Sequence, residues 1–390
     1  MRRLIWLSFG LLAGAFSCSG PDHLPPIEGL SGGGGGSAVM DAGLDVEPGD
    51  ALLGICGQEI IPALTDLPNL YFILDRSGSM SDAFQDSSVS KYETARDLLG
   101  DVLRQIGHRV RYGAAVFPAL SNPDGCGPGV QVFPTTQGDA PSYARDGQTG
   151  PILSDLLSRL GYAEQEGGTP TAATLEALRP ILADLGARTY VVLATDGAPN
   201  CNDQATCSAA SCMLNIEHAS VDGTACEGSY NCCDPASAGS GANAWCVDGD
   251  ALEQQVSALT ELGITTYVIG MPGAEIYADL LDRLAELGGT AQAGASAYFA
   301  ADDTQSLSDA LFAIGTGVAI SCSISLEHAP EDPAQVNVYF DETLVPLDAA
   351  DGWDWSGTQA FEVHGTACEQ LKSGAVLEVQ VAYGCPTVVR

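Results

Sequence analysis

A short polar motif after an apolar run gathers oxygen atoms on one tight turn. Asp75, Ser77 and Ser79 stand on alternate positions, so that a carboxylate and two hydroxyls can face one point. The preceding residues 70–74 read Leu-Tyr-Phe-Ile-Leu, which predicts a buried strand of a parallel sheet. Open α/β sheets bind ligands at the carboxyl edge of their strands, where Asp75 would lie. Serine-rich turns are common, so the motif needs support from elsewhere in the chain.

Two later segments supply that support. In Gly167-Gly168-Thr169-Pro170, Thr169 suits the N-cap of a helix and Pro170 its first position, which places the threonine hydroxyl at a loop tip. The run Thr189 to Ala194 predicts a second buried strand, and Thr195-Asp196-Gly197 follows it directly. Asp196 is therefore expected at the same sheet edge as the first motif.

The pattern D-x-S-x-S, then T, then D is the metal-ion-dependent adhesion site of the von Willebrand factor A (VWA) family. The chain resembles that family over roughly residues 66–318, and each position of the site is present: Asp75, Ser77, Ser79, Thr169 and Asp196. The resemblance implies that Ser77, Ser79 and Thr169 bind the ion directly, and that the aspartates bind it directly or through water. The alternative is that these residues are ordinary caps and turns at strand ends.

An oxygen-only donor set of hydroxyls and carboxylates suits a small hard dication, Mg²⁺, and tolerates Mn²⁺ or Ca²⁺. Family members leave one coordination position open and fill it with a carboxylate from a partner. Because most ligands of the site are neutral, the bound ion stays electrophilic enough to attract that anion. The resemblance therefore implies a protein or matrix partner that presents an Asp or Glu carboxylate.

The composition narrows the class of partner further. The 390 residues carry a formal net charge of −35, which argues against a nucleic acid or an anionic membrane surface as the partner. The apolar fraction of 45% is normal for a globular core, and no transmembrane segment is expected in the mature region.

The amino terminus reads as a signal peptide over residues 1–17. Arg2 and Arg3 form a positive start, and residues 4–16 are apolar but too few to span a bilayer. Residues 15–18, Ala-Phe-Ser-Cys, resemble a bacterial lipoprotein cleavage box with Cys18 as the lipidated residue. Plain secretion is the alternative.

Residues 18–55 read as a flexible tether that is rich in Gly and Pro and contains the run Gly32 to Gly36. We therefore expect export across the inner membrane and an outer-membrane or cell-surface lipoprotein, in contact with the membrane only through its lipid anchor.

The cysteines indicate the same oxidising compartment. Of 13 cysteines, Cys18 belongs to the lipoprotein box, which leaves an even number for disulfides. These candidates are Cys56, Cys126, Cys201, Cys207, Cys212, Cys226, Cys232, Cys233, Cys246, Cys322, Cys368 and Cys385.

Seven of the candidates fall between residues 199 and 249, a segment without helical or strand periodicity. We expect a loop-rich insert there, held by its own bridges. Because seven is odd, one insert cysteine must pair outside the segment, and Cys126 is the natural partner. Zinc binding is the alternative, but the paired C-x₂-C spacing of zinc sites is missing.

Regular alternation of apolar strands and amphipathic helices predicts the fold class. It is an α/β fold with a doubly wound, mostly parallel sheet and helices on both faces, Rossmann-like, over residues 56–319. Ser90 and Glu93 form a capping box before one helix, and Asp250 and Glu253 suggest a second box. Neither of the usual glycine-rich phosphate-binding motifs occurs in the chain.

Residues 320–390 change character. Short alternating runs separated by Asp, Pro and Gly predict a small β module, expected to be marginal alone and stabilised by disulfides.

Two classes of function remain. The first is a surface-tethered binding or adhesion protein that recognises a partner carboxylate through a dication; its alternative is a periplasmic assembly or accessory factor that uses the VWA domain for protein–protein interaction. The second class is an enzyme, and the chain lacks H-E-x-x-H, G-x-S-x-G and a cysteine beyond the disulfide parity. We therefore expect a non-enzymatic binding protein.

Overall fold

The computed structural model describes residues 59–62 and 67–389, apart from 120–124, 162–163, 187, 228–229, 320–321, 327, 373–375 and 377. The expected signal peptide, Cys18, the tether and Cys56 lie outside the described residues. In the part that is described, no helix is both long enough and apolar enough to cross a membrane.

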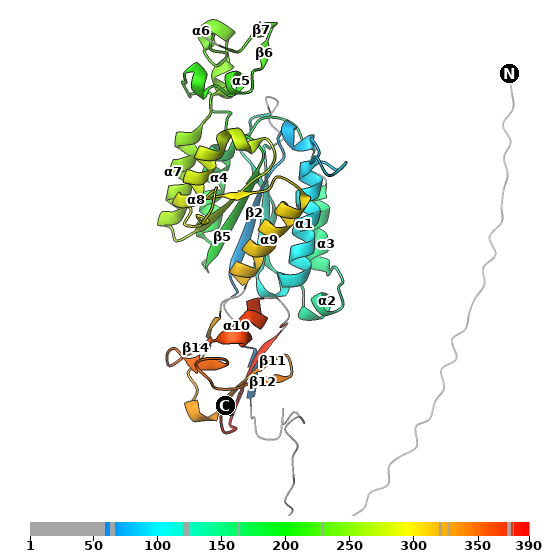
Figure 1. Cartoon of the computed structure of the whole chain (residues 1–390), viewed down its shortest axis with the longest axis vertical. Coiled ribbons are helices and arrows are strands. Elements are labelled where there is room, and N and C mark those ends of the chain that lie inside the picture. The colour runs from blue at the N-terminus through cyan, green and yellow to red at the C-terminus, as the bar shows by residue number, and fades with distance from the viewer. Residues whose placement is uncertain are drawn as a thin grey trace, which may run out of the picture. The chain divides into compact units, whose positions relative to one another are not determined.

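A six-stranded sheet forms the centre of the larger domain (Figure 1). Its strand order is β4-β3-β2-β5-β8-β9, and the pairs are parallel except for β4, which runs antiparallel to β3 at one edge. The strands are β2 (Asn69–Asp75), β3 (Arg111–Phe117), β4 (Val130–Gln137), β5 (Thr189–Thr195), β8 (Thr265–Gly270) and β9 (Phe299–Ala300).

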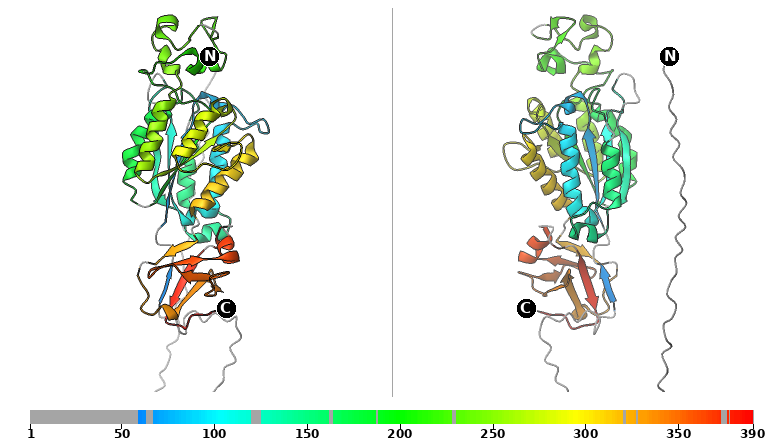
Figure 2. Two further views of the ribbon diagram at one scale, coloured as in Figure 1. Left: turned by 60° about the vertical axis from the view of Figure 1, so that its left-hand side comes forward. Right: turned by 90° about the vertical axis from the view of Figure 1, so that its right-hand side faces the viewer.

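Alternate residues of the central strand β2 face opposite layers of helices. Leu70, Phe72 and Leu74 pack into one apolar cluster, and Tyr71 and Ile73 pack into another. The continuous apolar run of this strand is therefore explained by burial on both faces. The first cluster includes residues of α1 (Lys91–Ile106), α3 (Pro151–Gly161) and α9 (Thr304–Ala319), and the second those of α4 (Thr171–Ala183), α7 (Gly249–Glu261) and α8 (Ala278–Leu287). The fold is thus the α/β, doubly wound, VWA-like sheet that the sequence predicts (Figure 2).

Short elements fill the connections of this domain. They are η1 (Gly78–Ser81), η2 (Gly107–Arg109), α2 (Pro141–Arg145) and η5 (Ala274–Tyr277), and in the insert η3 (Ala209–Ser211), α5 (Met213–Ile216), β6 (Ser220–Val221), β7 (Thr224–Ala225), α6 (Pro235–Ala238) and η4 (Ala242–Trp245).

The β module contains two small sheets, with strand orders β1-β15-β11-β12 and β10-β14-β13. Their elements are β1 (Glu59–Pro62), β10 (Ser323–Ser325), η6 (Pro333–Gln335), β11 (Val336–Phe340), β12 (Thr343–Val345), β13 (Trp353–Trp355), β14 (Ala360–Val363), α10 (Gly365–Lys372) and β15 (Val379–Tyr383). Trp353 is fully buried and packs edge-on against Trp355 and Phe361.

The strand β1 differs from the sequence-based division of the chain. Residues 59–62 fall in the range 56–319 assigned to the larger domain, but β1 pairs antiparallel with β15 of the β module. The larger domain is therefore inserted between two strands of the smaller sheet. A strand of four residues carries too little periodicity to reveal which sheet it joins.

Two helix starts differ from expectation. Helix α4 begins at Thr171 with Pro170 as its N-cap, so Thr169 lies one position before the cap. The Thr169 carbonyl accepts hydrogen bonds from the backbone N–H groups of Thr171 and Asn200, and these bonds hold Thr169 in a loop. Helix α7 begins at Gly249, so that Asp250 lies in the first turn, where its charge suits the helix dipole, instead of capping. Ser90 is the N-cap of α1 as predicted: its hydroxyl accepts from the Glu93 N–H, and it also lies within hydrogen-bond distance of Glu93 Oε2.

Candidate metal centre

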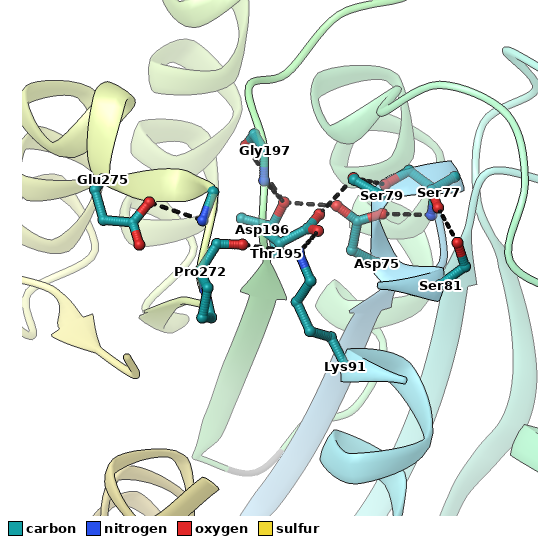
Figure 3. Close-up of polar contacts among 12 residues, drawn as sticks. Asp75, Ser77, Ser79, Ser81, Lys91, Thr195, Asp196, Gly197, Pro272 and Glu275 are labelled. Atoms are coloured by element: carbon teal, nitrogen blue, oxygen red, sulfur yellow. Dashed lines mark hydrogen bonds and ion pairs between the residues drawn. The ribbon is translucent and has the colours of Figure 1, made fainter. Parts of the chain in front are cut away.

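The D-x-S-x-S loop leaves the carboxyl end of β2 and folds back on itself. Asp75 is fully buried, and its Oδ1 accepts a hydrogen bond from the Ser77 N–H at 2.7 Å. The Oγ atoms of Ser77 and Ser79 lie 3.2 Å apart. These three side chains therefore converge on one small region, as Figure 3 shows.

The neighbouring strand β5 brings the second carboxylate to the same region. Ser79 Oγ donates to Asp196 Oδ1 at 2.8 Å, and Thr195 Oγ1 donates to Asp75 Oδ2 at 2.6 Å. Both bonds connect the end of β2 and the loop after it with the end of β5 (Figure 3). The parallel register of β2 and β5 is what aligns the two strand ends.

Thr169 lies on a third loop that contacts the first. The Gly78 N–H donates to the Gly167 carbonyl at 3.1 Å, which ties the two loops together. The Thr169 N–H donates to Asn200 Oδ1 at 2.9 Å, and the Asn200 N–H returns a bond of 2.9 Å to the Thr169 carbonyl. Thr169 is 5% exposed. Its backbone is therefore held firmly beside the loop of Ser77 and Ser79.

A buried cation completes the polar cluster. Lys91, at the start of α1, places its Nζ 2.6 Å from Asp196 Oδ2 and donates to the Pro272 carbonyl at 2.8 Å. The side chain of Lys91 is 6% exposed and that of Asp196 is 0% exposed. Asp196 thus engages Lys91 through one oxygen and Ser79 through the other.

Burial dominates the electrostatics of the two carboxyl groups. Desolvation, followed by the nearby charge of Asp196, raises the pKa of Asp75 from 3.8 to about 7. Desolvation also raises the pKa of Asp196, although the ammonium of Lys91 opposes that shift. Both groups are therefore held in a place where negative charge is unfavourable without a compensating cation.

A disulfide clamps the loop of Thr169 from outside. Cys126 and Cys201 form a bridge, and a methyl group at Gly168 would lie 2.5 Å from Cys201 Sγ. A methyl group there would also lie 2.8 Å from Asn200 Oδ1. Only glycine leaves room for the bridge at this point, so the disulfide packs directly against the residue before Thr169.

The insert between residues 199 and 249 is stapled by three further bridges. They pair Cys207 with Cys246, Cys212 with Cys233, and Cys226 with Cys232. The link of an insert cysteine to Cys126 is the pairing that cysteine parity predicts. Although the sulfur atoms of Cys207, Cys233 and Cys246 cluster, each belongs to a disulfide, so they offer no thiolate for zinc. In the β module Cys322 pairs with Cys368, and Cys385 is also disulfide-bonded.

The insert returns to the domain near the metal centre. Tyr277 of η5 donates its hydroxyl hydrogen to Glu217 Oε1 at 3.2 Å, just after α5. Burial raises the pKa of Glu217, and the charge of Asp196 adds to that shift. Glu217 is therefore within electrostatic range of the site.

The donor set fits a small dication. Two carboxylates and two serine hydroxyls converge, and the burial of both acids makes a positive ion favourable between them. Asp75, Ser77, Ser79 and Asp196 would hold the ion, with Thr169 on the loop beside them. A bound dication would supply an electrophilic centre for an anionic ligand.

Sequence reasoning missed three residues that support the site: Lys91, Thr195 and Asn200. Thr195 is the last residue of β5 and stands directly before Asp196. Its place at the carboxyl end of a predicted strand is the signal that could have identified it. Lys91 is the first residue of α1, where a lysine is unfavourable beside the helix dipole. That local mismatch was the one signal available in the sequence.

Comparison with known proteins gives distant structural similarity only. No family model matches the chain, and no curated protein matches it. The pilus adhesin SpaC from Lactobacillus rhamnosus GG is similar at a TM-score of 0.43 and 16% identity, over 84% of this chain and 40% of the adhesin. This chain therefore spans less than half of that adhesin's length.

Two further solved structures are similar at the same level. The PilB minor pilin from Streptococcus sanguinis has a TM-score of 0.41 and 16% identity, over 65% of this chain and 61% of the pilin. The vWF domain of the pili tip protein Mfa5 from Porphyromonas gingivalis has a TM-score of 0.40 and 12% identity, over 65% of this chain and 95% of that domain.

We expect Asp75→Asn to abolish Mg²⁺ binding without destabilising the metal-free protein. The amide oxygen can still accept from the Ser77 N–H, the amide NH₂ can donate to Thr195 Oγ1 once that hydroxyl turns, and the change removes one of two buried charges that repel each other. At mildly alkaline pH the variant should be more stable than the wild type by about 1–3 kcal/mol in the absence of metal. Titration calorimetry and thermal unfolding measure both effects. The exposed Asp155→Asn is the control, and an unchanged Mg²⁺ affinity in Asp75→Asn would rule out the metal site.

Dication affinity should rise with pH. Because the folded-state pKa of Asp75 is raised to about 7, the metal-free protein loses stability as the pH rises from 3.8 towards 7. A dication competes with the proton on this group, so binding should release protons below neutrality and strengthen towards alkaline pH. Calorimetry in two buffers of different ionisation enthalpy measures the released protons. Equal affinity at mildly acidic and alkaline pH, with no proton release, would contradict this expectation.

The disulfide clamp can be tested with Gly168→Ala. The added methyl group must displace Cys201 Sγ or Asn200 Oδ1, and either movement shifts Thr169. We expect Mg²⁺ affinity to fall about tenfold or more, equivalent to about 1.4 kcal/mol. Gly317→Ala is the control, because nothing lies within 4 Å of a methyl group there. Wild-type affinity in Gly168→Ala would show that the bridge does not position the loop.

Proposed function

We propose that this protein is a binding or adhesion protein whose VWA-like domain holds a divalent cation and uses it to capture a carboxylate of a partner. The observation that carries the proposal is the convergence of Asp75 and Asp196 on the hydroxyls of Ser77 and Ser79 at the carboxyl edge of the sheet. The resident ion would be Mg²⁺, with Mn²⁺ or Ca²⁺ as substitutes.

The chemistry of the ligands favours an anionic partner. The serine hydroxyls are neutral ligands and do not offset the charge of the ion. The ion can therefore bind a further anionic ligand in addition to the two carboxylates of the site. An Asp or Glu side chain of a protein or matrix ligand has the hard oxygen that such an ion prefers. The strongly negative chain, with a net charge of −35, offers few other sites of attraction for a carboxylate.

The proposal is for binding and not for catalysis. In the part of the chain that the structure describes, every cysteine is disulfide-bonded, which leaves no thiol nucleophile there. An accessory role in periplasmic assembly is the second candidate, and it would use the same site. We propose an outer-membrane or cell-surface location, with anchoring through Cys18, which the amino-terminal sequence favours.

Dication-dependent capture provides the direct test. Wild-type protein is incubated with outer-membrane or matrix extracts in Mg²⁺ or in EDTA, beside Asp75→Asn and the exposed control Asp155→Asn. We expect a partner to be retained by wild type and Asp155→Asn in Mg²⁺ and to be lost in EDTA and in Asp75→Asn. A partner retained equally in all conditions would show that the metal centre is not the binding site.

We further expect the insert to select the partner. Its base is closed by bonds from Asn202 to Asp248 and from the Asp248 N–H to the Pro199 carbonyl, so residues 203–246 can be replaced by a short Gly-Ser connector. This replacement keeps the Cys126–Cys201 bridge and removes the three internal bridges as complete pairs. Calorimetry should show wild-type Mg²⁺ affinity, and partner capture should fall at least about tenfold. Retained capture would make the insert a stabilising elaboration only.

A further inference from the structure

The structure contains a cation of its own inside the candidate metal centre. Lys91 Nζ lies 2.6 Å from Asp196 Oδ2, and the two side chains are 6% and 0% exposed. Among the ion pairs of the described residues this is the one in which both side chains are buried, whereas the pair of Arg159 and Asp155 is half exposed on each side. Exposed pairs contribute little to stability, but a buried pair is strongly coupled to its surroundings.

The position of Lys91 has no explanation in its own helix. It is the first residue of α1, where the helix dipole disfavours a cation and where acidic side chains are usual. Burial of an ammonium group is also unfavourable unless it is paired. Both costs are offset by the contacts with Asp196 and with the Pro272 carbonyl. The lysine is therefore kept in place by the metal centre and not by helix formation.

The charge of the site follows from these contacts. When both carboxyl groups are ionised, as in alkaline buffer, Asp75 and Asp196 contribute two negative charges and Lys91 one positive charge, so the metal-free cluster has a formal charge of −1. A dication changes this charge to +1. Without the lysine the loaded cluster would be neutral, and its field at the open coordination position would be much weaker.

We propose that Lys91 tunes the metal centre: its ammonium weakens the binding of the dication and strengthens the binding of a carboxylate to the loaded ion. This inference rests on the proposed function, since it concerns the same ion and the same partner group. In the metal-free protein Lys91 also holds Asp196 in position by satisfying Oδ2 while Ser79 satisfies Oδ1.

Three substitutions separate charge from structure. Lys91→Met removes the charge and keeps the apolar stem, Lys91→Gln keeps a hydrogen-bond donor without the charge, and Lys91→Arg keeps the charge. Mg²⁺ affinity is measured by titration calorimetry on the full mature chain in alkaline buffer. Acetate affinity is measured on the Mn²⁺-loaded protein from the paramagnetic broadening of the acetate methyl resonance.

We expect both neutral variants to bind Mg²⁺ about tenfold more tightly than the wild type, because a repelling charge near the ion is removed. The same variants should bind acetate about tenfold more weakly once loaded. Lys91→Arg should stay within about twofold of the wild type in both measurements. A merely structural lysine would instead lower both affinities when it is replaced.

Thermal unfolding supplies a readout that does not depend on the anion. The stabilisation by saturating Mg²⁺ should be larger in Lys91→Met than in the wild type, because the ion then replaces the missing ammonium. A neutral variant that folds only when Mg²⁺ is present supports the proposal. One that stays unfolded at saturating Mg²⁺ counts against it, as does a Mg²⁺ affinity at or below that of the wild type in the neutral variants.

The outcomes also distinguish this inference from the proposed function. If the wild type shows neither Mg²⁺ binding nor acetate broadening with Mn²⁺, the metal centre itself is wrong. If the wild type binds both while the neutral variants bind Mg²⁺ and acetate as it does, only the role of Lys91 is wrong.

Discussion

The site depends on the burial of two carboxylates side by side at the carboxyl edge of the sheet. Asp75 and Asp196 are 0% and 2% exposed, so each is stable as an anion only with partners that replace water. The chain supplies hydroxyls, a backbone N–H and the ammonium of Lys91. These partners leave the cluster negative, and a dication is the ligand that would reverse its charge. The metal-free fold therefore carries an unfavourable electrostatic term that binding of an ion would relieve.

Loops carry most of the donors, and they need a rigid frame because they lack the hydrogen bonding of helices and strands. Backbone bonds from Gly78 to Gly167 and between Thr169 and Asn200 join the loops to one another. The Cys126–Cys201 bridge then fixes the outer side of this assembly across a sequence separation of 75 residues. A covalent link of that span removes freedom from the unfolded chain and holds the donors at fixed separations.

The sequence was sufficient for features with a local signal. Continuous apolar runs identified β2 and β5, and the aspartate that ends or follows each run identified the sheet edge. The odd number of cysteines in the insert predicted that Cys126 pairs with one of them, and its partner is Cys201. The pairing of β1 with β15 and the ion pair of Lys91 and Asp196 join residues far apart in the chain, the latter separated by 105 positions. Nothing in local periodicity encodes such contacts, and the loop of Thr169 before α4 is likewise held by a bond from the distant Asn200 N–H.

The short stretch from Asp196 to Cys201 connects the candidate metal centre to the insert, so the insert begins close to the position where a partner carboxylate would bind. Asp196 contributes a carboxylate, Asn200 pairs with Thr169, and Cys201 joins the start of the insert to Cys126. A dication attracts any accessible carboxylate, so it provides affinity with little discrimination. Discrimination requires a surface that fits one partner and obstructs others. In the proposed function the insert is that surface, because its bridges fix its shape and its root shares the backbone that carries the metal ligands. Partner choice could then change through residues 203–246 while the ion site stays the same.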